Sequence, residues 1–166
     1  ASKVAKARDE SPRALVDRGA FTFVDPPDVG VGWDALRADL GPGVLPVVGD
    51  VATVTWGLHL AKGDSLSWID GRGRPVELRV VGVIENSVLQ GGLWVDRTAL
   101  TTRFPGVAGD SVLLVDVPET RVAPVTAALS TALVDHGVVV EDSTTRLAAF
   151  AAIEDTYLTI FRALGG

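Results

Sequence analysis

The sequence contains no cysteine and no methionine, and it has only two histidines and one tyrosine among its 166 residues. Without cysteine the chain has no disulfide, no thiol nucleophile and no thiolate ligand for a metal. The two histidines, His59 and His136, have no second metal-binding residue at helical or hairpin spacing. Each is expected near the end of a helix, where an imidazole interacts favourably with the helix dipole. Both histidines are therefore predicted to be structural.

Motifs that bind phosphate or activate a nucleophile are also missing. The glycines of residues 71–74 and 106–109 do not form GxGxxG, and GxxxxGK[ST] does not occur. Gly63-Asp64-Ser65 lacks the flanking glycines of a nucleophile elbow. We therefore predict a chain that is not an enzyme, does not bind or hydrolyse nucleotide, and needs no metal or cofactor. A hydrolase with paired carboxylates is an open alternative, because carboxylates distant in sequence can converge in space.

Three other groups of residues have a structural explanation. The acidic pairs Glu141-Asp142 and Glu154-Asp155 fit helix capping or a solvated face. Arg72 and Arg74 fit the solvated tip of a hairpin. The tryptophans could line a pocket, but packing in the core is the favoured interpretation. They are Trp33, Trp56, Trp68 and Trp94.

Long runs of one residue class are absent as well. The net charge is −6 and the pI is near 4.8, which disfavours binding to nucleic acid or to an anionic membrane surface. No run of 18 apolar residues occurs, so no segment is predicted to span a bilayer. Residues 1–11 lack the apolar core of a signal peptide and are predicted to be a disordered start. Since methionine is absent even at position 1, we expect the chain to be part of a longer protein.

The hydrophobic pattern predicts a mixed α/β fold. Alternating residues on both sides of an Asp-Gly-Arg-Gly-Arg-Pro turn predict a β-hairpin at about residues 64–86. Its second strand is expected to place Val80 with Ile84 on one face and Val81 with Val83 on the other. Because both faces are apolar there, this strand is predicted to be central and covered.

The remaining strands and helices are predicted from apolar runs and from the capping, proline and glycine residues at their ends. Strands are expected at residues 20–24, 44–49 and 93–95, and helices at 12–18, 33–41, 51–60 and 97–104, the last two capped by Asp50 and Asp96. The final third is expected to be βαβα, with parallel strands at 111–117 and 138–140. Its first helix carries Pro124 in the first turn and ends at Gly137. Its second helix spans Ser143 to Leu164, with Asp142 or Ser143 as its cap.

Three stretches resemble one protein family. They are LPVVGDVATVTWGL (45–58), GLHLAKGDSLSWIDGRGRPVELRVVGVIENSVLQGGLWVD (57–96) and FAAIEDTYLTIFRALGG (150–166). In this order they resemble the extracytoplasmic, periplasmic core-like domain of ABC transporter permeases of the FtsX/MacB type. The resemblance covers roughly residues 12–166, and the basic start ASKVAKARDES has no counterpart in it.

The resemblance implies a non-catalytic domain outside the cytoplasmic membrane that couples ATP-driven movement of membrane helices to a substrate or partner. It implies a separate cytoplasmic ATPase and an extracytoplasmic partner protein, lipoprotein or lipid, and allows a homodimer. Residues 12–142 would form the domain, and residues 143–166 a stalk that leads into a membrane span. The family motif includes Gly63, Asp64 and Gly82. The membrane-proximal stalk residues would be Glu154, Tyr157, Phe161, Arg162 and Leu164.

One further alternative is a stand-alone extracytoplasmic module that binds a small ligand or a lipid in a pocket lined by tryptophan. Apolar segments of about 20 residues on both sides of this sequence would favour the permease domain. A separate gene with a signal peptide would favour the binding module.

Overall fold

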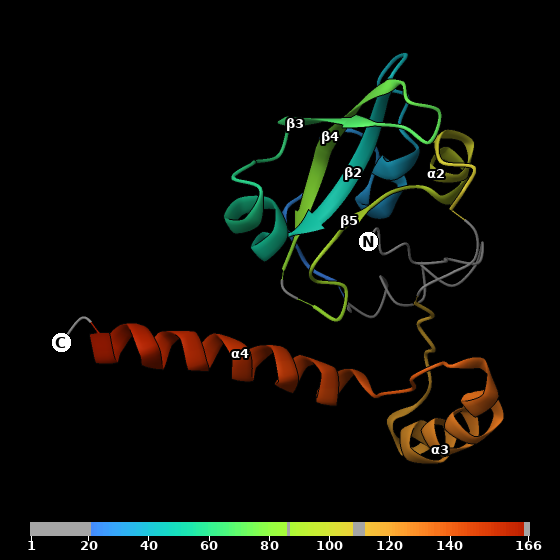
Figure 1. The fold of residues 1–166 in the computed structure, drawn as a ribbon, viewed down its shortest axis with the longest axis vertical. Coiled ribbons are helices and arrows are strands. Elements are labelled where there is room, and N and C mark those ends of the chain that lie inside the picture. Colours follow the sequence, from blue (N-terminus) through green and yellow to red (C-terminus); the bar gives the residue numbers. More distant parts are fainter. Residues whose placement is uncertain (1–20, 86, 108–111, 165–166) are drawn as a thin grey trace. The chain divides into compact units, whose positions relative to one another are not determined.

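The computed structural model describes residues 21–85, 87–107 and 112–164, with the backbone alone for 153–161 and 163 (Figure 1). The chain forms two compact units divided between Leu114 and Val115. Helices of the 3₁₀ or π type are labelled η. The first unit contains β1 (Phe23–Asp25), η1 (Gly32–Arg37), β2 (Val44–Asp50), η2 (Ala52–Gly57), β3 (Ser65–Ile69), β4 (Pro75–Ile84), β5 (Leu93–Trp94) and α2 (Arg97–Arg103).

The first unit is built on a mixed five-stranded sheet in which β4 is central. Strand β4 pairs in parallel with β2 and antiparallel with both β1 and β3. Strand β5 adds a short antiparallel pair at Val48 and Gly49 on the other edge of β2. The predicted hairpin is confirmed, with Ser65 opposite Arg79 and Ile69 opposite Pro75. The mixed α/β class is likewise confirmed.

The core consists of two clusters, one on each face of the sheet. Val81 and Ile84 belong to the cluster that packs against η1, whereas Val80 and Val83 belong to the cluster that contains Val54 of η2. The predicted central, covered strand is therefore confirmed, but the predicted pairing of residues on its faces is wrong. The reason is a bulge in the pairing with β2, where Val47 lies opposite Val80 but Val48 lies opposite Gly82. One extra residue reverses the alternation of all later side chains.

The second unit contains helices: η3 (Glu119–Arg121), α3 (Val122–Leu133), η4 (Val134–His136) and α4 (Ser143–Leu164). Pro124 lies in the first turn of α3, and Gly137 follows η4 with a φ of 65°, as predicted for a helix end. Asp142 accepts hydrogen bonds from the backbone N–H and the hydroxyl of Thr145 at 2.9 and 2.7 Å. These bonds, the hydroxyl bond first, lower the pKa of Asp142. The predicted cap and the 22-residue helix are thus confirmed.

The strands predicted at 111–117 and 138–140 are not formed by the described residues of those segments, apart from a single bridge at Val112. Leu113 and Val115 are exposed, and Val139 is 86% exposed. The predicted βαβα arrangement of the final third is therefore wrong for the described part of the chain. A run of apolar residues has a high β propensity, but a strand also needs a neighbour that satisfies its backbone hydrogen bonds.

Several predicted elements are present with different bounds. The segment 20–24 forms a strand only from Phe23, the segment 33–41 is a 3₁₀ helix that ends at Arg37, and the segment 51–60 is a π-helix that ends at Gly57. The helix predicted at 12–18 and the start at 1–11 lie outside the described residues. In the described part of the chain, no helix has both the length and the apolar character needed to cross a bilayer.

Candidate functional site

The turn at Gly63 and Asp64 connects η2 to the hairpin and is bonded to the middle of β4. Gly63 has a φ of 92°, a conformation that favours glycine, and its N–H donates to the carbonyl of Val80 at 2.7 Å. The N–H of Val80 donates to the carbonyl of Asp64 at 2.9 Å. The Asp64 carboxylate accepts from the N–H of Ala61 at 2.8 Å, which closes the turn. These contacts give Gly63 and Asp64 a structural role in forming the turn and holding it on β4.

Lys62, next to this turn, connects it to the loop after β1. Its ammonium donates to the carbonyl of Pro26 and to the carboxylate of Asp28, and it pairs with Asp25 at 2.8 Å. The hydrogen bond to Asp25, followed by that to Asp28, raises the pKa of Lys62. No local sequence pattern predicts this contact, because Lys62 and its partners are 34 and more residues apart.

Gly82, the third motif residue, lies where the ring of Phe23 covers the sheet. A Cβ atom at this position would lie 3.0 Å from Cε1 of Phe23 and 3.2 Å from Cγ of Pro27. Glycine is thus required by the close packing of the loop against β4. Since the N–H and carbonyl of Val80 bind the Gly63-Asp64 turn, the three motif residues lie close together around the bulge of β4.

Asp50, at the end of β2, is fully buried and holds two segments together. Its carboxylate accepts from the N–H and the hydroxyl of Thr53 at 2.9 and 2.7 Å, and from the N–H of Gly91 at 2.9 Å. The first two bonds confirm the predicted cap. The third joins the start of η2 to the loop before β5, and no local sequence pattern predicts it because its partners are 41 residues apart.

The predicted stalk residues all lie on α4 in the second unit. The side chains of Glu154, Tyr157 and Phe161 are outside the described residues, whereas Arg162 is exposed and Leu164 is 80% exposed. Near the start of α4, the guanidinium of Arg146 pairs with Glu141 at 2.5 Å and lies 5.4 Å from the ring centre of Phe150. None of the described side chains of α4 is buried.

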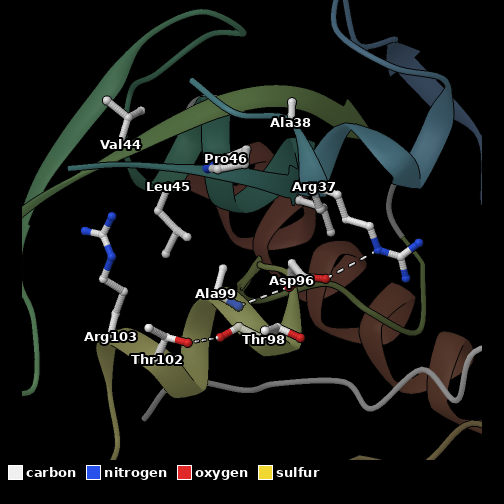
Figure 2. Close-up of a pocket in the computed structure, with 11 residues that line it drawn as sticks. Arg37, Ala38, Val44, Leu45, Pro46, Asp96, Thr98, Ala99, Thr102 and Arg103 are labelled. Carbon is white, nitrogen blue, oxygen red and sulfur yellow. Dashed lines mark hydrogen bonds and ion pairs between the residues drawn. The ribbon is translucent and has the colours of Figure 1, made fainter. Parts of the chain in front are cut away.

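A groove of about 370 Å³ lies between the outer edge of β2, η1 and α2 (Figure 2). Leu45 and Pro46 lie between two arginines, Arg37 and Arg103, as Figure 2 shows. Arg37 pairs with Asp34 and Asp96, both at 3.5 Å, whereas the guanidinium of Arg103 has no partner among the described residues. The other lining residues are Leu36, Ala38, Val44, Thr98, Ala99 and Thr102. The groove can therefore accept an apolar group that carries a negative charge at one end.

The tryptophans differ in their surroundings, and none of them lines this groove. Trp94 is buried, with its indole N–H donating to the carbonyl of Leu89 at 3.1 Å, and Trp33 packs edge-on against Phe21 and Phe23. Trp56 and Trp68 are exposed. The prediction of core packing is thus confirmed for two tryptophans and wrong for the other two.

Both histidines lie at helix ends, as predicted. His59 follows η2 with a φ of 55°, His136 is the last residue of η4, and both side chains are exposed. The part of the chain that the structure describes contains no group of three or more His, Asp or Glu side chains placed to hold a metal ion.

Asp70 organises the tip of the hairpin. Its carboxylate accepts from the N–H groups of Arg72 and Arg74 at 2.8 and 2.9 Å, and it pairs with the Arg74 guanidinium at 2.9 Å. Arg72 is exposed, so the predicted solvated tip is confirmed, with Arg74 held by an ion pair. The hydrogen bond from the N–H of Arg74 is the largest cause that lowers the pKa of Asp70.

We expect Asp70→Asn to lower the melting temperature by several degrees at pH 7. A carboxyl whose pKa is lowered by folding stabilises the folded state above its ordinary pKa of about 3.9 and loses this effect as the pH falls through the lowered value. The difference in melting temperature between the two proteins should therefore shrink below about pH 4. Thermal unfolding of both proteins, followed by circular dichroism from pH 7 to below about pH 4, measures this difference. A difference in melting temperature that does not depend on pH contradicts the prediction.

Comparisons of this chain with family models, curated proteins and solved structures found no match.

Proposed function

We propose that this chain is a non-catalytic extracytoplasmic domain of an ABC transporter permease of the FtsX/MacB type. In this proposal, membrane helices of the parent protein hold the domain outside the cytoplasmic membrane. A separate cytoplasmic ATPase drives their movement, and the domain passes that movement to a partner protein, lipoprotein or lipid. The domain itself uses no cofactor.

The observation that carries the proposal is helix α4. It is continuous over 22 residues, which corresponds to about 33 Å at roughly 1.5 Å per residue. None of its described side chains is buried, and the apolar residues Leu147 and Leu164 are exposed. A long helix with exposed apolar residues suits a rigid connection whose apolar stripe packs on other parts of a membrane protein.

The packing around the family motif supports the proposal in a second way. Gly63, Asp64 and Gly82 belong to the motif of the family that the chain resembles, and each has a distinct backbone or packing role around the bulge of β4. Their roles are structural, which agrees with a domain that transmits force and performs no chemistry. Two carboxylates that the fold brings together, Asp25 and Asp28, share the ammonium of Lys62 in ion pairs.

We expect Phe161→Asp to leave this chain folded but to reduce transport by the parent protein about tenfold or more, because an unpaired carboxylate in an apolar contact costs at least about 1.4 kcal/mol. Circular dichroism of the chain and a transport assay of the parent protein measure the two effects. Thr159→Asp is the matched control, because a helical period of 3.6 places Thr159 on the face opposite the stripe of Tyr157, Phe161 and Leu164. Loss of folding with Phe161→Asp, or equal transport by both variants, contradicts the proposal.

A second candidate function, a module that binds a small ligand or a lipid, is favoured by the groove beside β2. Its volume lies in the range of small-molecule sites, and Arg103 can pair with a carboxylate or phosphate there. Titration with a fluorescent fatty acid would show saturable binding that weakens in Arg103→Gln. A lack of saturable binding to the unmodified chain removes this candidate.

A further inference from the structure

Strand β3 has one edge that no other strand covers among the described residues. It pairs only with β4. Its sequence, Ser-Leu-Ser-Trp-Ile, contains no charged residue and no proline, and these are residues that usually protect a sheet edge from pairing with another chain. Trp68 and Ile69 are 55% and 57% exposed.

The outer edge of β2 shows the protection that β3 lacks. The carbonyl of Gly43 accepts from the N–H of Glu77. The alternation along β2 therefore directs the backbone groups of Leu45 toward β4 and those of Val44 and Pro46 toward the outer edge. Pro46 has no N–H to offer at that edge. Residues of η1 and α2 line the groove at this edge (Figure 2).

The free backbone groups of β3 belong to its odd-numbered residues. The carbonyl of Asp64 accepts from Val80, and the N–H of Asp70 donates to Arg74. Even-numbered residues therefore direct their backbone groups toward β4, and Ser65, Ser67 and Ile69 direct theirs outward.

We propose that β3 pairs antiparallel with β3 of a second copy of this chain, about a two-fold axis at Ser67. Ser67 then faces Ser67 of the second copy, and each Ser65 faces Ile69. These are the residues with outward N–H and carbonyl groups, so every one of those groups finds a partner. Leu66 and Trp68 meet as non-hydrogen-bonded neighbours on one face, where side chains approach most closely and aromatic–aliphatic pairs stabilise a sheet.

The sequence of β3 favours a second copy over a different protein, because this register is complementary to itself. The strand itself carries no charge to repel its copy. Asp64 and Asp70 flank it and would lie opposite each other across the axis, but the carboxylate of Asp70 is already paired with the Arg74 guanidinium at 2.9 Å. Glu77 on β4 is three strand spacings, or about 14 Å, from its symmetry mate, where salt screens repulsion. The contact is smaller than the roughly 1,200 Å² of stable interfaces. The dimer should therefore be weak, with a dissociation constant of about 0.1 to 1 mM. This inference does not depend on the proposed function.

The absence of cysteine allows a direct test. In this register the two Cα atoms of residue 67 are about 5.5 Å apart, within the range that a disulfide spans. Under mild oxidation, Ser67→Cys should form a disulfide-linked dimer at least about ten times faster than Thr101→Cys, a variant with its thiol on the exposed face of α2. Equal rates overturn the proposal.

Analytical ultracentrifugation of the unmodified chain, which has no cysteine, provides the second measurement. The average mass should rise toward twice that of the monomer as the concentration approaches about 1 mM. Ser67→Pro removes an outward N–H and Ser67→Lys brings two like charges together, so both should remain monomeric at an unchanged melting temperature, whereas Ser67→Thr should still dimerise. A monomeric unmodified chain, or a dimer that persists in both the proline and lysine variants, overturns the proposal and leaves the edge to a strand of another protein.

Discussion

Asp50→Ala is expected to lower the free energy of unfolding by about 3 to 5 kcal/mol. The carboxylate is fully buried and accepts three hydrogen bonds from Thr53 and Gly91. Alanine leaves those donors without partners in a place that water does not reach. Because domains of this size are stable by only about 5 to 15 kcal/mol, the melting temperature should fall by about 10 °C.

Two further variants separate the contributions to this loss. Asp50→Asn keeps an oxygen that can accept from the N–H of Thr53 but presents an amide group to Gly91, so we expect a loss of about 1 to 3 kcal/mol. Asp39→Ala is the matched control, since its carboxylate accepts one exposed bond from Gly41, and its loss should stay below about 1 kcal/mol. Urea unfolding measures all three variants, and an Asp50→Ala loss no larger than that of the control contradicts the role of Asp50.

The second large effect is expected at Gly49, where β2 passes under η2. A Cβ atom there would lie 2.5 Å from Cγ2 of Val54 and 2.9 Å from Cδ2 of Leu93. Val54 is fully buried and β-branched, so its side chain cannot rotate away without strain. Gly49→Ala should therefore lower the free energy of unfolding by about 2 to 3 kcal/mol through overpacking.

A double-mutant cycle tests this cause. Val54→Ala alone should cost about 2 to 4 kcal/mol by leaving a cavity. In the double variant the new methyl group occupies part of that cavity, so the combined loss should fall short of the sum by about 1 to 2 kcal/mol. Gly106→Ala, in open space at an exposed turn, should change stability by less than about 0.5 kcal/mol. Additive losses in the cycle would contradict the proposed contact.

Local sequence signals determined much of this protein. Alternation on both sides of a glycine-rich turn predicted the hairpin, and the carboxylates of Asp50, Asp96 and Asp142 predicted three helix starts, because a cap acts on N–H groups two or three residues away. The sequence likewise predicted the helix end at Gly137 and the full length of α4. Each of these features depends on neighbours along the chain.

Other features were decided by the tertiary structure, because they depend on residues distant in sequence. The bulge beside Gly82 arises from the fit of β4 against β2 and the ring of Phe23, and it moved Val83 and Ile84 to the faces opposite to those predicted. The Lys62 contacts and the groove at Arg103 join segments that no motif connects. The apolar segments at 113–115 and 138–140 are a case where a local signal failed because the tertiary structure did not support it. Their composition favours strands, but a strand requires a partner for its backbone hydrogen bonds, and only tertiary structure supplies one.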